Sequence, residues 1–171
     1  LRHKAAGVDI IQAQGHEGGG HTGRVGTMAV VPQVVDAVAP TPVIAAGGIA
    51  DGRALVAALA LGAVGVWVGS AFLFAEESGV LEVHRKQLLE AIEESTEITR
   101  LWSGKTGRLL KNPLQEAFSK SGLRPLPLPL QFIISMDIAN SFEKAGRIDL
   151  MANPCGQIIG MLKQIKPAKQ I

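Results

Sequence analysis

The stretch from Ala13 to Gly23, which reads AQGHEGGGHTG, holds the residues of this chain best suited to chemistry. Two histidines and three consecutive glycines follow directly on the apolar run Val8–Ile11. Glycine lets a backbone approach a ligand closely, and histidine exchanges a proton near neutral pH. We therefore interpret the stretch as a ligand-binding loop after a buried strand rather than a linker, since function concentrates in loops on rigid scaffolds.

His21 is the favoured candidate base in this loop, because the glycines beside it leave room for a substrate. His16 is the second imidazole, and only Glu17 nearby could complete a metal shell, so no metal site is expected. Cys155 is expected to be a packing residue, and His84 is expected on a solvent-facing helix surface.

Three apolar runs, Val8–Gln14, Pro42–Ala46 and Gly65–Val68, are predicted to be buried parallel strands. Each ends in glycine, at Gln14-Gly15, Gly47-Gly48 and Gly69-Ser70. Parallel strands bring these ends to one edge, where bare amides can converge on an anion. A βα barrel binds phosphate in the loops after its last two strands, which suits Gly48, Gly69 and the Ser70 hydroxyl.

Helical patterns separate the strands, from Pro32 to about Ala39 and from the N-cap Asp51 through Leu61, with Gly62 as the stop. This alternation predicts an α/β fold built from right-handed βα units. The chain opens on the last turn of a helix that Gly7 ends, as expected of a fragment.

The pattern of apolar and polar residues changes after Ser78. An amphipathic helix is predicted over Val80–Glu94, followed by an irregular region to Gly122. Alternating prolines make Leu123–Pro129 extended, and we interpret it as a packed connector. Two further helices are predicted, over about Ile133–Ala145 and Gly156–Ile165.

Two nucleotide-binding motifs match only formally. Gly18–Gly23 fits G-x-G-x-x-G, but no helix is expected to open at once after it. Gly104-Lys105-Thr106 resembles the end of a P-loop, but Thr99 stands at the position of the first glycine and no strand is expected before it. Neither motif is retained.

The bulk composition excludes several function classes. The chain has 171 residues, 17 of them basic and 15 acidic, with no basic stripe, so no nucleic-acid partner is expected. No apolar run approaches the roughly 18 residues that span a bilayer, so no membrane partner is expected either. A single cysteine suggests a reducing compartment, and we expect a cytoplasmic protein.

Two long segments carry a family resemblance. AQGHEGGGHTGRVGTMAVVPQVVDAV and PVIAAGGIADGRALVAALALGAVGVWVGSAFL resemble the nitronate monooxygenases, once called 2-nitropropane dioxygenases, which are FMN-dependent (β/α)8 barrels. WSGKTGRLLKN and LPLPLQ continue the resemblance more loosely. It implies that residues 1–79 are the last three βα units of a TIM-type barrel, and that residues 80–171 form a mainly helical lid region with a closing helix.

The resemblance also implies residue roles. The family's Glu-x-Gly-Gly-His segment matches Glu17 to His21, which makes His21 the catalytic base that removes the α-proton of a nitroalkane or contacts a bound nitronate. His16 is an uncommon neighbour and leaves open which imidazole does the chemistry. The usual Gly-Thr-Arg is Gly-Ser-Ala here, so the arginine is lost at Ala71. The implied FMN contacts are Gln14, Gly19, Gly20, Gly47, Gly48, Gly69 and Ser70.

The activity that the resemblance implies is oxidation of alkyl nitronates, of the propionate 3-nitronate or nitroalkane type, by O₂ to a carbonyl compound and nitrite. Two alternatives stay open: an FMN-dependent enoyl-thioester (enoyl-ACP) reductase that uses NADH, and a non-catalytic flavin-binding fragment, since three βα units cannot close a barrel. The natural substrate and the oligomeric state, a homodimer included, are not fixed by the sequence.

Overall fold

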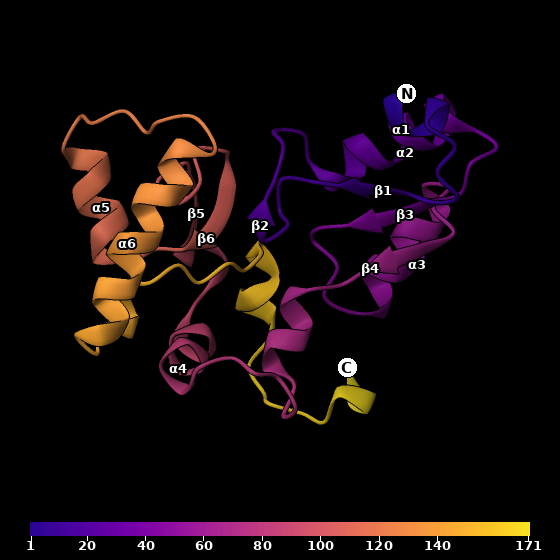
Figure 1. Ribbon diagram of the computed structural model, residues 1–171. Helices are drawn as coiled ribbons and strands as arrows, with labels where there is room; N and C mark the ends of the chain where they lie inside the picture. The colour runs from indigo at the N-terminus through magenta and orange to yellow at the C-terminus, as the bar shows by residue number, and fades with distance from the viewer.

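A parallel three-stranded sheet organises the first part of the chain in the computed structural model, which describes residues 1–171 (Figure 1). The strands are β1 (Ile11–Gln14), β3 (Val43–Ala46) and β4 (Gly65–Trp67), in the order β1-β3-β4. The three predicted strands are confirmed. Because neighbouring strands run parallel, their carboxyl ends lie at one edge of the sheet.

Helices α2 (Thr27–Val38) and α3 (Gly52–Ala60) connect these strands and confirm the α/β class. Asp51 caps α3 as predicted, since its carboxylate accepts from the Arg53 amide at 2.9 Å. Small and β-branched side chains from both layers form the core, which consists of Ala13, Val31, Val38, Val43, Ala45, Ile49, Ala58 and Ala63. The short helix α1 (Arg2–Ala5) precedes the sheet.

The predicted start of the second helix at Pro32 is wrong, because α2 begins at Thr27 and contains Pro32. The Glu17 carboxylate accepts from the Thr27 amide at 3.0 and 3.1 Å. A negative charge at a helix N-terminus satisfies its free amides and interacts favourably with the helix dipole. This partner comes from the glycine-rich loop, outside any local capping pattern.

A second sheet is antiparallel and contains β2 (Gly20–His21), β6 (Gly107–Leu110) and β5 (Thr96–Thr99), in the order β2-β6-β5. The expectation of an irregular region here, with no strand before Gly104, is wrong. These strands are only two to four residues long, and β2 pairs with β6 from a distant part of the chain. Such pairing is decided by partners that local periodicity does not reveal.

Three helices follow β4: α4 (Glu82–Glu90), α5 (Pro113–Lys120) and α6 (Leu130–Lys144). The helix predicted over Ile133–Ala145 is confirmed by α6. The segment 123–129 joins α5 to α6, but the expectation that it is packed is wrong, since Leu123 is 68% exposed. None of the helices combines the length and the apolar character needed to cross a membrane.

The helix predicted over Gly156–Ile165 is wrong, because the chain there forms only the short 3₁₀ helix η4 (Gln157–Met161). The Gly156 amide donates to Ser70 Oγ at 2.8 Å, and the Gln157 amide donates to the Glu17 carbonyl at 3.0 Å. These donors are satisfied by distant parts of the chain. The C-terminal segment thus returns to the loops that follow β1 and β4. In Figure 1 its yellow helix lies next to β2.

Candidate functional site

One cavity of about 260 Å³ opens at the carboxyl ends of the three parallel strands. The loops after β1, β3 and β4 all contribute to its walls. Ligands of parallel α/β sheets bind outside this end of the strands. The structure brings together in its lining all of the predicted cofactor contacts: Gln14, Gly19, Gly20, Gly47, Gly48, Gly69 and Ser70.

Glycine is required where the loops meet. Gly47 has a φ of +87°, and a Cβ there would lie 2.9 Å from the Gly15 carbonyl oxygen. Gly48 follows at a φ of +75°. Residues other than glycine rarely adopt such a backbone conformation. This wall of the cavity therefore consists of peptide groups without side chains.

Ser70 is the hydroxyl group in the cavity wall. Its Oγ accepts from the Gly156 amide, and its own proton is donated to no acceptor in the protein, so it is free for a ligand oxygen. No lysine or arginine lines the cavity, and Ala71 is buried where the family's usual arginine would stand. The donors therefore are neutral backbone amides, the Gln14 side-chain amide and one hydroxyl, a set that suits a phosphate. The one charged residue of the lining is Glu17, whose carboxylate accepts from the Thr27 amide and hydroxyl.

Gln14 lines the cavity and also ties two strands together. Its side-chain amide donates to the His21 carbonyl at 3.0 Å and accepts from Gln12 at 3.3 Å. The amide of Gln14 therefore positions β2, which carries the candidate base, relative to β1.

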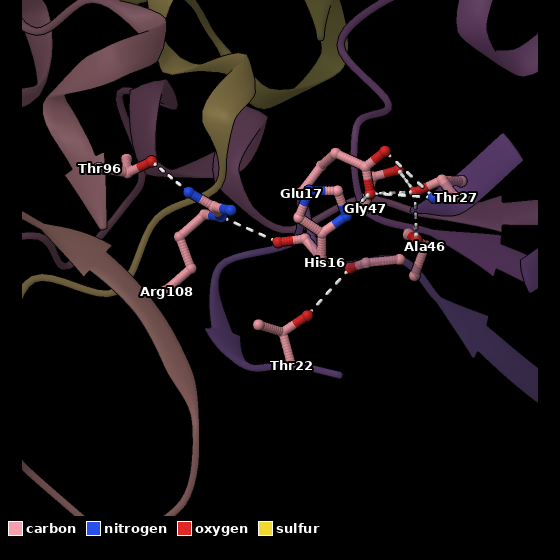
Figure 2. A network of polar contacts seen from close by, with 9 residues as sticks. His16, Glu17, Thr22, Thr27, Ala46, Gly47, Thr96 and Arg108 are labelled. Carbon is pink, nitrogen blue, oxygen red and sulfur yellow. Dashed lines mark hydrogen bonds and ion pairs between the residues drawn. The ribbon is translucent and has the colours of Figure 1, made fainter. Parts of the chain in front are cut away.

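Glu17 lines the cavity, and its polar contacts fix the shape of the loop (Figure 2). Besides the Thr27 amide, its carboxylate contacts Thr27 Oγ1 at 2.9 Å, and the same hydroxyl lies 2.8 Å from the Gly47 carbonyl. The glycine loop, the start of α2 and the end of β3 are thus held by one polar cluster. This role of Glu17 was not predicted from the sequence.

Arg108 is a buried residue that the sequence analysis missed. It is 6% exposed, and it donates from Nε to the His16 carbonyl at 2.9 Å and from Nη1 to Thr96 Oγ1 at 2.8 Å (Figure 2). Burial lowers the pKa of its guanidinium, while the Glu17 and Cys155 side chains act in the opposite direction. In the sequence, Arg108 is a single basic residue between Gly107 and two leucines, and this pattern alone does not indicate a buried arginine.

His21 lies next to the cavity rather than in its lining. Its Nε2 lies 2.7 Å from Ser103 Oγ, and β2 places it opposite Gly107. The imidazole lines a neighbouring pocket, which shares Gly20 and Pro154 with the cavity. Ser103 was not predicted, because the contact joins positions far apart in the sequence.

The remaining imidazoles have other surroundings. His16 Nδ1 lies 3.5 Å from Glu17 Oε2, and His16 is absent from the lining of the cavity and of the neighbouring pocket. The expectation that His84 is solvated is wrong, since it is 9% exposed and its Nε2 lies 3.0 Å from the Ile148 carbonyl.

Cys155 is buried, as expected of a packing residue, among Phe74, Leu88, Leu110 and Ile159. Burial raises the pKa of its thiol to about 12, so the thiolate is scarce at neutral pH. The neighbouring Gly156 lines the cavity and lies close to the loop after β1, since a Cβ there would lie 2.7 Å from the Glu17 carbonyl oxygen. Gly156 was not predicted from the sequence to be part of the wall.

The fold and the cavity define an α/β protein with a glycine-lined cavity at the carboxyl ends of its parallel strands, where proteins of this class bind ligands. Comparison with known proteins identifies the class further. The family model for nitronate monooxygenase matches residues 2–171, and the chain belongs to that family.

Two relatives show how much of the family this chain covers. A Mycobacterium tuberculosis protein named as a monooxygenase is 43% identical over 99% of the chain and 47% of its own length. A Bacillus subtilis protein named as a nitronate monooxygenase is 40% identical over 96% of the chain and 50% of its own length. The chain therefore spans about half the length of the relatives it matches.

Two solved structures match nearly the whole of this chain. A nitroalkane oxidase from Streptomyces ansochromogenes matches with a TM-score of 0.85 and 32% identity, over 98% of this chain and 50% of that one. FabK from Thermotoga maritima matches with a TM-score of 0.82 and 34% identity, over 99% of this chain and 53% of that one.

Proposed function

We propose that this chain binds FMN and, with it, oxidises alkyl nitronates by O₂ to a carbonyl compound and nitrite. The observation that carries the proposal is the meeting of three strand-end glycine loops in one cavity, beside which His21 contacts Ser103. Membership of the nitronate monooxygenase family supports it. We further propose that residues 1–79 are part of a (β/α)8 barrel and that residues 80–171 cover its site.

The cavity suits FMN in the chemistry of its donors. Gly48, Gly69 and Ser70 would hold the phosphate with backbone amides and the free hydroxyl proton of Ser70. Gln14, Gly19, Gly20 and Gly47 would contact the rest of the cofactor. When bound, FMN would take electrons from the nitronate and pass them to O₂.

Ser103 would set the proton on the His21 ring. Its Oγ accepts from the Lys105 amide at 3.3 Å and can donate to the Lys105 carbonyl at 3.4 Å. His21 Nε2–H then donates to Ser103 Oγ, which leaves the lone pair on Nδ1. Nδ1 would be the atom that takes the α-proton of a nitroalkane or contacts a nitronate, with Ser103 as a positioning residue.

His21 is proposed as the base in preference to His16. The His16 ring lies beside Glu17 and lines neither the cavity nor the neighbouring pocket. A base must come within hydrogen-bond reach of the proton that it removes. His21 meets this condition for a substrate in the neighbouring pocket, since it forms part of that wall.

The experiment is a comparison of the chain with its His21→Ala and His16→Ala variants, by flavin fluorescence titration and by O₂ consumption with nitroalkanes. His21→Ala should bind FMN normally and lose about 10²- to 10⁴-fold in turnover, the usual range for general acid–base catalysis. His16→Ala should keep its turnover. Unchanged turnover in His21→Ala contradicts the assignment.

The same preparation tests the two rivals. An enoyl-thioester reductase would consume NADH with an enoyl thioester and no O₂ with a nitronate. A non-catalytic flavin-binding fragment would bind FMN but consume neither NADH nor O₂. A chain that is colourless and aggregates when purified would contradict the proposed FMN binding.

A further inference from the structure

Helix α6 buries polar residues and leaves large apolar residues exposed. Its buried residues are Gln131 and Ser135, whose side chains donate to the Leu101 carbonyl at 2.6 and 2.9 Å. The Gln131 side-chain oxygen also accepts from the Leu126 amide at 2.9 Å. These hydrogen bonds fix which side of α6 faces the rest of the molecule, so the apolar side is held toward the outside.

The exposed side of α6 is an apolar surface, which we call the α6 patch. Its six residues are between 36% and 57% exposed: Leu130, Phe132, Ile133, Ile134, Met136 and Ile138. Six half-exposed side chains of this size present about 500 Å² together, and the largest apolar patch on a monomer is typically about 300–600 Å² and often functional. In Figure 1, α6 lies beside α5, away from the parallel sheet.

The area of the α6 patch fits the centre of a protein–protein interface. Each partner of a stable interface buries about 800 Å², with an apolar centre and a more polar rim. Leu126 and Leu128, which are 41% and 42% exposed, precede the helix and would extend the centre. Asp137 and Asn140 are exposed on the second half of α6 and would belong to the rim.

The order of apolar and polar residues is the same in both directions from Ile133. The residues one, three and five positions away are apolar and those two positions away are polar: Phe132 and Ile134, Leu130 and Met136, Leu128 and Ile138, with Gln131 and Ser135 between them. A two-fold axis that crosses α6 near Ile133 would therefore bring apolar residues of one copy against apolar residues of the other. Such self-complementarity is what a two-fold interface requires.

We propose that the α6 patch is the interface of a two-fold symmetric homodimer of this chain, with Ile133 close to the axis. The proposal does not depend on the flavin chemistry. Charge argues against a lipid surface as the occupant, because α6 carries Asp137 and Glu143 but only one basic residue, Lys144. Helices that lie on membranes are typically rich in lysine and arginine on their polar side.

The test is sedimentation velocity of the chain and two variants over a range of concentrations. The chain should be dimeric, and Ile133→Asp should raise its dissociation constant at least about 100-fold, because two like charges would face each other at the axis. Val56→Asp is the matched control, since Val56 is 65% exposed but lies on α3. The control should dimerise as the wild type does, and circular dichroism should show that both variants fold.

A disulfide provides a second readout. Cys155 is the only cysteine of the chain and is buried, so a thiol introduced on the surface would react without a competitor. Ile133→Cys should form a covalent dimer on mild oxidation, because its two thiols would lie close to each other across the axis. Asn140→Cys, about 10 Å further along the helix, should form much less.

A chain that is monomeric at every concentration overturns the inference, and so does a monomer that instead sediments with vesicles of phosphatidylcholine and phosphatidylglycerol. A dimer that Ile133→Asp leaves intact, or that Val56→Asp dissociates equally, places the interface elsewhere and also overturns it. Equal yields of covalent dimer from Ile133→Cys and Asn140→Cys contradict an axis near Ile133.

Discussion

Replacement of Arg108 by methionine removes the cation that joins the second sheet to the glycine-rich loop. The guanidinium is buried and donates to the His16 carbonyl and to Thr96 Oγ1. Methionine has a similar length but no donor, so both acceptors would lose their partner. The loop from Gly15 to Gly20, which forms one wall of the cavity, would lose a fixed point.

The size of the effect follows from the two hydrogen bonds. Each bond to a charged donor contributes about 1.5–3 kcal/mol, and the lost desolvation penalty of the arginine offsets part of the sum. We expect Arg108→Met to lower the free energy of unfolding by about 1–3 kcal/mol. Displacement of the loop should also weaken FMN binding. A displacement that costs about 1.4 kcal/mol of binding free energy lowers the affinity about tenfold.

Urea unfolding followed by circular dichroism measures the first effect, and flavin fluorescence titration measures the second. Lys120→Met is the control, since it removes another basic side chain from an exposed ion pair with Glu116. The control should behave as the wild type in both assays. Wild-type stability and FMN affinity in Arg108→Met would refute the reasoning that this residue holds the loop.

Three further changes test other parts of the site. Gly47→Ala should lower the free energy of unfolding by about 1–2 kcal/mol for the left-handed backbone alone, and further through the close contact with Gly15. Urea unfolding measures this loss, and flavin titration should show that FMN binding is lost as well. Normal FMN binding would contradict a close loop contact. Ser103→Ala should keep FMN affinity but lower kcat/KM for a nitroalkane, because the His21 tautomer is no longer fixed. An unchanged kcat/KM removes Ser103 from the mechanism. Cys155 should resist iodoacetamide at pH 8 until the chain unfolds, because its thiol is buried. The pKa of this thiol is about 12 in the folded chain and near 9 in the unfolded chain. The stability that the thiol contributes is therefore present below pH 9 and falls as the pH rises toward 12. Urea unfolding of Cys155→Ala should show a smaller decrease of the free energy of unfolding over this pH range.

Local patterns were sufficient to predict the parallel sheet and the edge at which the glycine-lined cavity opens. The apolar runs ending in Gly47-Gly48 and Gly69-Ser70 carry both the strand pattern and the turn residues, so periodicity and glycine position agree. The Asp51 cap is equally local, since its partner is two residues away.

The parts that could not be predicted depend on distant partners. Thr27 starts α2 because Glu17 reaches it from another loop, and η4 replaces an α-helix because Gly156 donates to Ser70. Arg108 and Ser103 acquire roles only when β2 pairs with β6. Sequence periodicity does not encode these contacts, because each joins segments with separate local patterns.

The central claim is that the strand-end glycine loops and Ser70 bind the phosphate of a flavin. Its most direct test is parallel fluorescence titration of the chain with FMN and with riboflavin, which differs only in lacking the phosphate. We predict one-to-one quenching by FMN, much weaker binding of riboflavin, and a smaller difference between the two in Ser70→Ala. Equal affinities for FMN and riboflavin, or no binding of either, would contradict the account.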